Sequence, residues 1–264
     1  MTEKIALLRK LHGGPRILVL PNAWDVASAR IFESAGFPAI ATTSAGVANS
    51  LGYPDVQKIR RGEMLGVIER IVKSLDVPVT GDVEAGYDDP LATALALVNM
   101  GAAGMNLEDS LGETGTLADI AAQVRVIEQI RAKTDLVINA RSDVYLMAVG
   151  DSATRFDRIV ERLNAYRKAG ADCLFAPGVR DAETIGKLAR AVDGPLNILA
   201  GAGTPTVAEL ERLGVARVSV GSGPMRACMG LTQRIAKELL EQGTYSSFTD
   251  GAIQYPAANR LFGG

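Results

Sequence analysis

Two carboxylates directly follow an apolar run in the first half of the sequence. Val77-Pro78-Val79-Thr80 predicts a buried strand, and Asp82 and Glu84 come after it in the segment Gly81 to Tyr87. Residues two apart in a strand point to the same side, so both side chains can present their oxygens to one point. This spacing indicates a divalent-metal site, although a short acidic turn that only caps a loop has the same local pattern.

Two more acids are expected beside this pair. Asp55 ends the segment Leu51 to Asp55, and Glu108 follows the next apolar run along the chain. Carboxylates gathered in so small a region repel one another unless a cation neutralises them. Because Asp55, Asp82, Glu84 and Glu108 offer only oxygen atoms, Mg²⁺ is the expected ion rather than Zn²⁺, with Mn²⁺ as an alternative.

Groups that bind an anionic substrate are expected in the same place. Arg141 ends a further apolar run, and its guanidinium can hold a carboxylate through two parallel hydrogen bonds. The small-residue turn that contains Thr43, Ser44 and Ala45 offers hydroxyl and amide groups to a carboxylate or another anion. All eight lysines lie in predicted helices, in flanking loops or near the amino terminus, which argues against a Schiff-base mechanism.

A repeated alternation of strands and helices is expected to position these residues. The predicted strands cover residues 17–20, 39–43, 77–81, 104–107, 136–140, 173–176, 196–200 and 217–220. The predicted helices cover residues 25–35, 61–75, 91–100, 118–133, 153–169, 182–192, 207–213 and 225–241. This α/β pattern is typical of a (β/α)8 barrel of the TIM type, with a doubly wound open sheet as the alternative. In such barrels the site lies at the carboxyl ends of the strands, where the acids fall.

The length of the chain favours a single domain. A barrel accommodates 264 residues of which 47% are hydrophobic, and no linker rich in Pro, Gly and Ser divides residues 1–264. The tail after the last predicted helix carries Phe248, Tyr255 and Phe262, which need a surface to pack on. We therefore expect the helix and tail, residues 225–264, to contact another subunit.

The bulk composition favours a small-molecule partner. With a net charge of −2 and a pI of about 5.6, the chain is not expected to bind nucleic acid or an anionic membrane. We find neither a bilayer-length apolar stretch nor the apolar core of a signal peptide, and therefore expect a cytoplasmic protein. The single histidine, His12, precedes the first predicted strand, which argues against a multi-histidine zinc site or a Ser-His-Asp triad.

Together, these residues resemble the isocitrate lyase and phosphoenolpyruvate mutase superfamily over nearly the whole chain. The segments that carry the resemblance are Ser28 to Arg30, Ala35 to Phe37, Leu51 to Asp55, Gly81 to Tyr87, Gly101 to Asp109, Asn139 to Arg141 and Tyr166 to Asp172. The resemblance implies a barrel whose eighth helix is exchanged between the subunits of a homodimer or homotetramer.

The resemblance also implies a role for each candidate residue. It implies Mg²⁺ bound directly by Asp82 and, largely through water, by Asp55, Glu84 and Glu108. It places the carboxylate-binding turn on Thr43, Ser44 and Ala45, and the substrate arginine on Arg141. Members of the superfamily cleave or form a C–C or P–C bond beside a 2-oxo carboxylate through a metal-stabilised enolate.

The loop after Glu108 departs from the pattern of the superfamily. The lyases have Lys-Lys-Cys-Gly-His or Lys-Arg-Cys-Gly-His there, whereas Asp109 to Thr116 contains no cysteine, lysine or histidine. The mutases have a lysine and an asparagine in this loop and a histidine where we align Pro177. The metal and enolate groups are therefore expected to be kept, while the groups that select the substrate and transfer protons differ.

These features predict a Mg²⁺-dependent C–C lyase or decarboxylase for a small 2-oxo or dicarboxylic acid, with Asp82, Glu108 and Arg141 as catalytic residues. Two alternatives are P–C chemistry of the phosphoenolpyruvate mutase or phosphonopyruvate hydrolase kind, and a catalytically silent protein that binds 2-oxo acids. Decarboxylation of an oxaloacetate-like acid needs no base for the bond-breaking step. Retro-aldol cleavage does, and Glu113, Tyr87 and a metal-bound hydroxide are the candidates.

Overall fold

The barrel predicted from the sequence is present in the structure, a computed structural model that describes residues 2–112 and 116–263. Its described strands all pair in parallel and follow the order β1-β9-β8-β7-β6-β5-β4-β3-β2. They are β1 (Leu18–Leu20), β2 (Asn22–Ala23), β3 (Ile40–Thr42), β4 (Val79–Asp82), β5 (Gly104–Glu108), β6 (Val137–Arg141), β7 (Cys173–Phe175), β8 (Leu196–Leu199) and β9 (Arg217–Ser219). The order of the strands is that of a sheet rolled into a TIM-type barrel.

The first strand of the barrel is divided at Pro21. Residues Leu18–Leu20 form β1 and pair with β9, whereas Asn22–Ala23 form β2 and pair with β3. Proline has no N–H group to donate to a ladder, but the carbonyl oxygen of Pro21 still accepts from Ala41 N at 2.9 Å. Both halves therefore belong to one chain segment that brings the two ends of the sheet together and nearly closes the ring.

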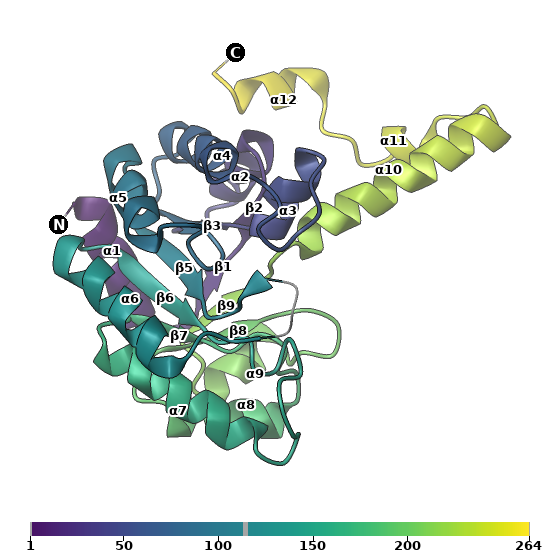
Figure 1. Ribbon diagram of the computed structural model, residues 1–264. Helices are drawn as coiled ribbons and strands as arrows, with labels where there is room; N and C mark the ends of the chain where they lie inside the picture. The colour runs from purple at the N-terminus through teal and green to yellow at the C-terminus, as the bar shows by residue number, and fades with distance from the viewer. Residues whose placement is uncertain (1, 113–115, 264) are drawn as a thin grey trace.

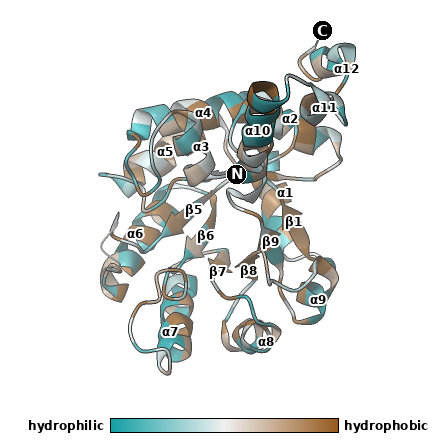
Figure 2. Ribbon diagram, turned by 90° about the vertical axis from the view of Figure 1, so that its right-hand side faces the viewer, coloured by the Kyte–Doolittle hydropathy of each residue, from teal (hydrophilic) through white to brown (hydrophobic). Residues whose placement is uncertain are grey.

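Helices surround the strands, as Figures 1 and 2 show. Those that alternate with the strands are α2 (Val26–Ser34), α4 (Arg61–Ser74), α5 (Pro90–Met100), α6 (Ile120–Lys133), α7 (Arg155–Lys168), α8 (Ala182–Ala191) and α9 (Val207–Arg212). The strands are almost completely buried, and the main hydrophobic core lies between them and this layer of helices. Within the part of the chain that the structure describes, four further short helices were not predicted, namely α1 (Glu3–His12), α3 (Ser44–Ser50), α11 (Ser246–Thr249) and α12 (Tyr255–Arg260).

Helix α1 covers the amino-terminal end of the barrel. Its Ile5 and Leu8 form a separate buried cluster with residues that precede or begin the strands, including Leu18, Ala39 and Ala103. His12, at the end of α1, is buried beside the fully buried Arg217, with 3.5 Å between its Nε2 and Nη1 of Arg217. This end is thus sealed by packing, and the open mouth of the barrel is at the carboxyl ends of the strands.

The buried histidine predicts a loss of stability in mild acid. Burial, reinforced by the positive charge of Arg217, lowers the pKa of His12 from 6.5 to about 4. As the pH falls below 6.5, His12 therefore becomes protonated in the unfolded chain, whereas in the folded chain it stays neutral until about pH 4. Between pH 7 and pH 5 we expect the free energy of unfolding to fall by about 2 kcal/mol more in the wild type than in His12→Gln. Urea titrations at both pH values measure this difference, and equal losses in the two proteins would contradict it.

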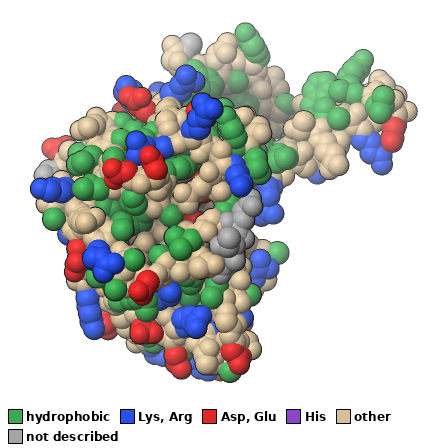
Figure 3. Space-filling model, in the orientation of Figure 1, with side chains coloured by type: hydrophobic (Ala, Val, Ile, Leu, Met, Phe, Trp, Pro, Cys, Tyr) green, Lys and Arg blue, Asp and Glu red, His purple; other side chains and the backbone are tan. Residues whose placement is uncertain are grey.

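The last long helix leaves the barrel. Helix α10 (Gly223–Glu241) begins after β9 but projects away from the other helices, and α11 and α12 follow at its far end (Figure 1). Figure 3 shows hydrophobic side chains along this arm, and Leu240 and Tyr255 are 87% and 79% exposed. Within the described residues, no helix combines the length and apolar character needed to cross a bilayer.

Candidate active site

Asp82 lies at the carboxyl end of β4, buried under the start of α3. Its Oδ2 accepts hydrogen bonds from the backbone N and the hydroxyl of Ser44, at 2.9 and 2.8 Å. Its Oδ1 accepts from Asn106 Nδ2 at 3.2 Å, and its own amide donates to the Thr42 hydroxyl at 2.8 Å. Ser44 and Asn106 therefore hold the carboxylate and Thr42 holds its backbone, which fixes the position of Asp82 at the mouth of the barrel.

Glu84 reaches the same region by a route that the sequence pattern did not predict. Strand β4 ends at Asp82, and Glu84 has a φ of +54°, so strand alternation does not set the direction of its side chain. Its Oε2 accepts from Gln57 N at 2.5 Å, and its Oε1 accepts from the Tyr87 hydroxyl at 3.3 Å. The expectation that strand geometry aligns Asp82 and Glu84 is wrong, because a left-handed turn places Glu84.

Backbone strain is concentrated around this acidic corner. Of the five non-glycine residues with positive φ in the described chain, four are Val56, Gln57, Glu84 and Tyr87. The left-handed conformation is unusual for any of these residue types and especially for the β-branched Val56. Such strain persists only where surrounding contacts enforce it, and it is common at functional sites. The hydrogen bond from Gln57 N to Glu84 joins the two strained segments.

Gly86 is required by the turn between these strained residues. Its φ is +89°, and a Cβ atom there would lie 2.7 Å from Cα and 2.6 Å from Cβ of Pro90. We therefore expect Gly86→Ala to lower the free energy of unfolding by about 2 to 3 kcal/mol, measured by urea titration. Gly52→Ala is the matched control, because Gly52 has a φ of +84° but open space around its Cβ position, so about 1 kcal/mol is expected. Equal losses at the two glycines would show that the clash is not the cause.

Arg141, which the sequence predicts to bind a substrate carboxylate, pairs with one of the acids. Its strand lies next to that of Glu108, with the two residues in register, and its Nη1 is 2.7 Å from Glu108 Oε2. Its Nε and Nη2 donate to the two carboxylate oxygens of Asp143 at 2.6 and 2.9 Å. Burial alone would lower the pKa of Arg141, but Glu108 and Asp143 raise it, so the guanidinium is charged at all relevant pH values.

The buried carboxylate of Asp109 holds the segment that carries Asp143, the partner of Arg141. Asp109 accepts hydrogen bonds from Asp143 N at 3.0 Å, from the Ser142 hydroxyl at 2.7 Å and from the Tyr166 hydroxyl at 2.8 Å. Arg162 on α7 also pairs with it at 3.0 Å. Asp109 and Asp143 were not among the site residues predicted from the sequence. Their positions directly after Glu108 and Arg141, at two neighbouring strand ends, were the available signal.

A cavity of about 130 Å³ lies between these groups. The predicted residues that line it are Ser44, Asp55, Glu84, Glu108 and Arg141. The other lining residues are Val56, Ser110, Gly112, Asp143, Leu146 and Met147. Asp82 is not among the lining residues, but it is hydrogen-bonded to Ser44, which is. The structure thus gathers most of the predicted site residues around one small cavity.

The predicted carboxylate-binding turn is the beginning of a helix. Thr43 precedes α3 as its N-cap, and its hydroxyl accepts from Gly46 N at 3.3 Å. Of the three residues, Ser44 lines the cavity, whereas the buried Thr43 and the half-buried Ala45 do not. The hydroxyl of Ser44 points to Asp82 rather than to a substrate position. The turn therefore contributes one candidate contact, Ser44.

The donor set matches a hard cation in its chemistry. Burial raises the pKa of Glu84 to about 7, and repulsion from Asp82 and then Asp55 adds to the shift. Desolvation also raises the pKa of Asp55, with a further contribution from Asp82, and burial raises that of Glu108 against the attraction of Arg141. Crowded, partly protonated carboxylates are relieved by a cation with a preference for oxygen. In the described residues, however, no three acid, histidine or cysteine side chains are close enough to bind one ion directly.

Of the candidate bases, Tyr87 lies among the described residues and contacts one of the acids. Tyr87 donates to Glu84, and burial together with the negative charge of Glu84 raises the pKa of its hydroxyl. The phenol therefore stays protonated at neutral pH and is placed to donate a proton rather than to accept one. Glu113 lies outside the described residues. Ser110, which the sequence did not single out, donates to Glu108 Oε1 at 2.5 Å and lines the cavity.

The fold and site define a TIM-type barrel with a crowded acidic mouth and one paired arginine. The family profile described as phosphoenolpyruvate phosphomutase matches residues 8–240 of this chain. The chain belongs to this family, within the superfamily of phosphoenolpyruvate mutase and isocitrate lyase that its sequence resembles.

Individual relatives include proteins named as lyases and as a decarboxylase. It is 39% identical to an uncharacterised protein of Mycobacterium tuberculosis, over 82% of each chain. It is 30% identical to the 2,3-dimethylmalate lyase of Eubacterium barkeri, over 79% of this chain and 76% of the relative. Further relatives are named 2-methylisocitrate lyase and oxaloacetate decarboxylase. A solved structure of a candidate lyase/mutase from Burkholderia cenocepacia J2315 superposes with a TM-score of 0.91 at 37% identity, covering 99% of this chain and 96% of that one.

Proposed function

We propose that this protein is a Mg²⁺-dependent carbon–carbon lyase or decarboxylase that acts on a small 2-oxo or dicarboxylic acid. The observation that carries the proposal is the 130 Å³ cavity, which is lined by Asp55, Glu84 and Glu108 and also by Arg141. A cavity of this size holds roughly four water-sized groups, which suits the reacting end of a 2-oxo acid. The lyase and decarboxylase names among the relatives support the same reaction class.

In this proposal the chain's own residues bind and orient the acid. Glu108 and Asp143 occupy three of the five N–H groups of Arg141, so two remain to bind a substrate carboxylate. Asp82 is the proposed direct ligand of Mg²⁺, and Asp55, Glu84 and Glu108 are proposed to hold it largely through water. When bound, the ion would supply the positive charge that stabilises an enolate oxygen. The Tyr87 hydroxyl, which donates to Glu84 on the wall of the cavity, is proposed to return the proton.

A turnover assay with and without the ion tests this function. The purified protein is incubated with oxaloacetate, 2-methylisocitrate and 2,3-dimethylmalate in Mg²⁺. Pyruvate is followed by coupled assay, and the second product of each cleavage (carbon dioxide, succinate or propanoate) by NMR. We expect at least one acid to be cleaved and EDTA to abolish the cleavage. Turnover that EDTA leaves unchanged would contradict the role of the metal. Magnesium-dependent binding without any turnover would favour a silent binding protein instead.

A second candidate is P–C bond chemistry on phosphonopyruvate or phosphoenolpyruvate. The family profile, whose description names a phosphomutase, supports it. Against it stands the departure of this chain from the mutase pattern at Pro177 and in the loop after Glu108. Phosphorus NMR after incubation with either compound distinguishes the two functions, because only P–C chemistry produces a new phosphorus resonance.

We further propose that α10 packs on a second copy of the chain in the cytoplasm, as a homodimer or homotetramer. The apolar arm projects from the barrel, and Met229 and Leu240 are exposed on it. Light scattering is expected to give a multiple of the 27.8 kDa chain mass, and Leu240→Glu to shift the population toward the monomer. Lys10→Glu, an exposed change on α1, is the control. A monomeric wild type at micromolar concentration would contradict the proposal.

A further inference from the structure

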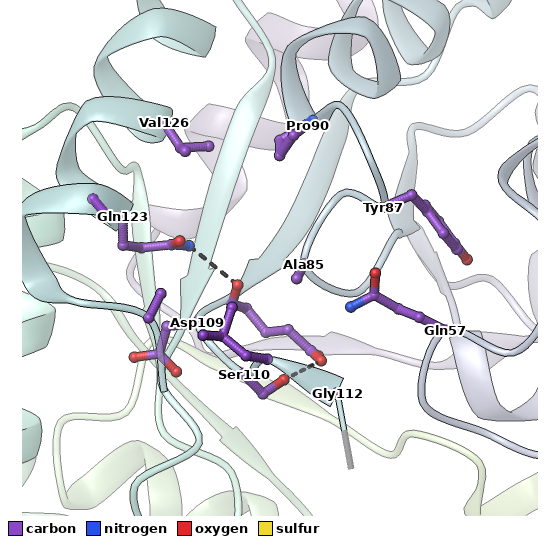
Figure 4. A pocket seen from close by; sticks show the side chains of 13 residues that line it. Gln57, Ala85, Tyr87, Pro90, Asp109, Ser110, Gly112, Gln123 and Val126 are labelled. Atoms are coloured by element: carbon purple, nitrogen blue, oxygen red, sulfur yellow. Dashed lines mark hydrogen bonds between the residues drawn. The ribbon is translucent and has the colours of Figure 1, made fainter. Parts of the chain in front are cut away.

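A second cavity adjoins the acidic one. It has a volume of about 480 Å³ and lies between the turn that follows β4 and the amino-terminal half of α6. Glu108 and Ser110 line both cavities. Figure 4 shows Gln123 and Val126 on one side of this second cavity and Pro90 and Tyr87 on the other. We call it the annex.

The walls of the annex are mainly apolar and firmly held. Ala85, Pro90, Ala122 and Val126 present carbon atoms to it. The turn on one side is fixed by the close approach of Gly86 to Pro90. On the other side, the buried Gln123 donates to the Glu108 carbonyl oxygen at 3.1 Å and so ties α6 to the end of β5. A preformed apolar surface beside a polar centre is typical of ligand sites.

The acidic cavity is small and the annex is large, so each can hold a different part of one substrate. Ligand sites usually occupy about 300 to 1,000 Å³, so the acidic cavity of about 130 Å³ is too small to hold more than the reacting end of a substrate. The annex lies within the usual range. The acids and Arg141 gather at the small cavity, and the surface of the large one is mainly apolar.

We infer that the annex is a specificity site that takes an alkyl substituent on the carbon next to the 2-oxo group, so that the preferred substrates are alkyl-substituted 2-oxo acids. The inference rests on the proposed function, because the acidic cavity must first hold the carboxylate and keto oxygen. The substituent then passes between Ser110 and the turn at Tyr87 into the annex. Each methylene that leaves water for this apolar space strengthens binding.

Ala122 and Ala121 form a matched pair for the test. Both are on α6, but Ala122 is half-buried and lines the annex, whereas Ala121 is exposed and does not. Ala122→Phe is expected to fill the annex without disturbing the core, and Ala121→Phe places the same side chain in solvent. Thermal melting of both variants verifies that they fold.

Calorimetry with excess Mg²⁺ measures the dissociation constants of pyruvate, 2-oxobutanoate, 2-oxopentanoate and 2-oxohexanoate. In the wild type and Ala121→Phe we expect affinity to rise about fourfold for each added methylene. In Ala122→Phe we expect the four acids to bind within about twofold of pyruvate. If the wild type binds all four acids with equal affinity, the annex inference is overturned while the proposed function stays intact. The same holds if both variants lose the rise in affinity with chain length. If no acid binds at all, the proposed function fails and the inference fails with it.

Discussion

Replacing Asp82 with asparagine is expected to lower kcat/KM by about 10³-fold or more, because the proposed direct ligand of the metal loses its charge. The carboxylate is buried and accepts hydrogen bonds from Ser44 and Asn106, which hold it in one position. Steady-state kinetics on the best substrate found, together with Mn²⁺ affinity from electron paramagnetic resonance, measure the effect. Both quantities are expected to fall together, since one missing charge accounts for both.

Asp88→Asn is the control for this change. Asp88 lies on the turn after the same strand, but its side chain is 78% exposed and pairs with Arg61. Its loss is expected to leave kcat/KM and Mn²⁺ affinity within about twofold of the wild type. If Asp82→Asn folds normally and keeps more than a tenth of the activity, Asp82 is not the metal ligand and the proposed mechanism is wrong.

Replacing Arg141 with lysine is expected to raise KM by about 10²-fold, because an ammonium group keeps the charge but loses the planar fork that binds a carboxylate. The structure adds a second expectation. Since Asp143 holds Nε and Nη2 of Arg141, Asp143→Asn should raise KM by about tenfold while changing kcat by less than threefold. This division between KM and kcat identifies Asp143 as a residue that positions Arg141.

Two measurements separate binding from folding in these variants. Removing one partner of a buried ion pair can cost about 3 to 5 kcal/mol of stability, so urea titrations must accompany the kinetics. Asp151→Asn, an exposed change in the loop after the same strand, controls for lost charge. A fall in kcat with an unchanged KM in Arg141→Lys would mean that Arg141 acts on the reacting atoms instead of holding the substrate.

Much of the framework was predictable from the sequence. Strands such as Gly104–Glu108 and Val137–Arg141 were expected to within one residue, because short apolar runs between longer amphipathic segments have few other stable arrangements. The position of Asp82, Glu108 and Arg141 at the mouth follows from the same pattern, since parallel strands end on one side of a barrel.

The arrangement within the mouth was decided by the tertiary structure. Glu84 is directed by a left-handed turn and by Gln57, which is 27 residues away, and Asp82 is covered by Ser44, which is 38 residues away. Arg141 pairs with Glu108 and with Asp143, which the sequence analysis did not single out.

The sequence by itself determined the barrel, the end at which the site lies and the types of side chain gathered there. Only the tertiary structure decided which of these side chains meet, which are free to bind a ligand, and that an apolar annex adjoins them. The physical reason is that periodicity ends where a strand ends. Beyond that point, the backbone angles of a loop are set by hydrogen bonds and packing between segments that are distant in the sequence.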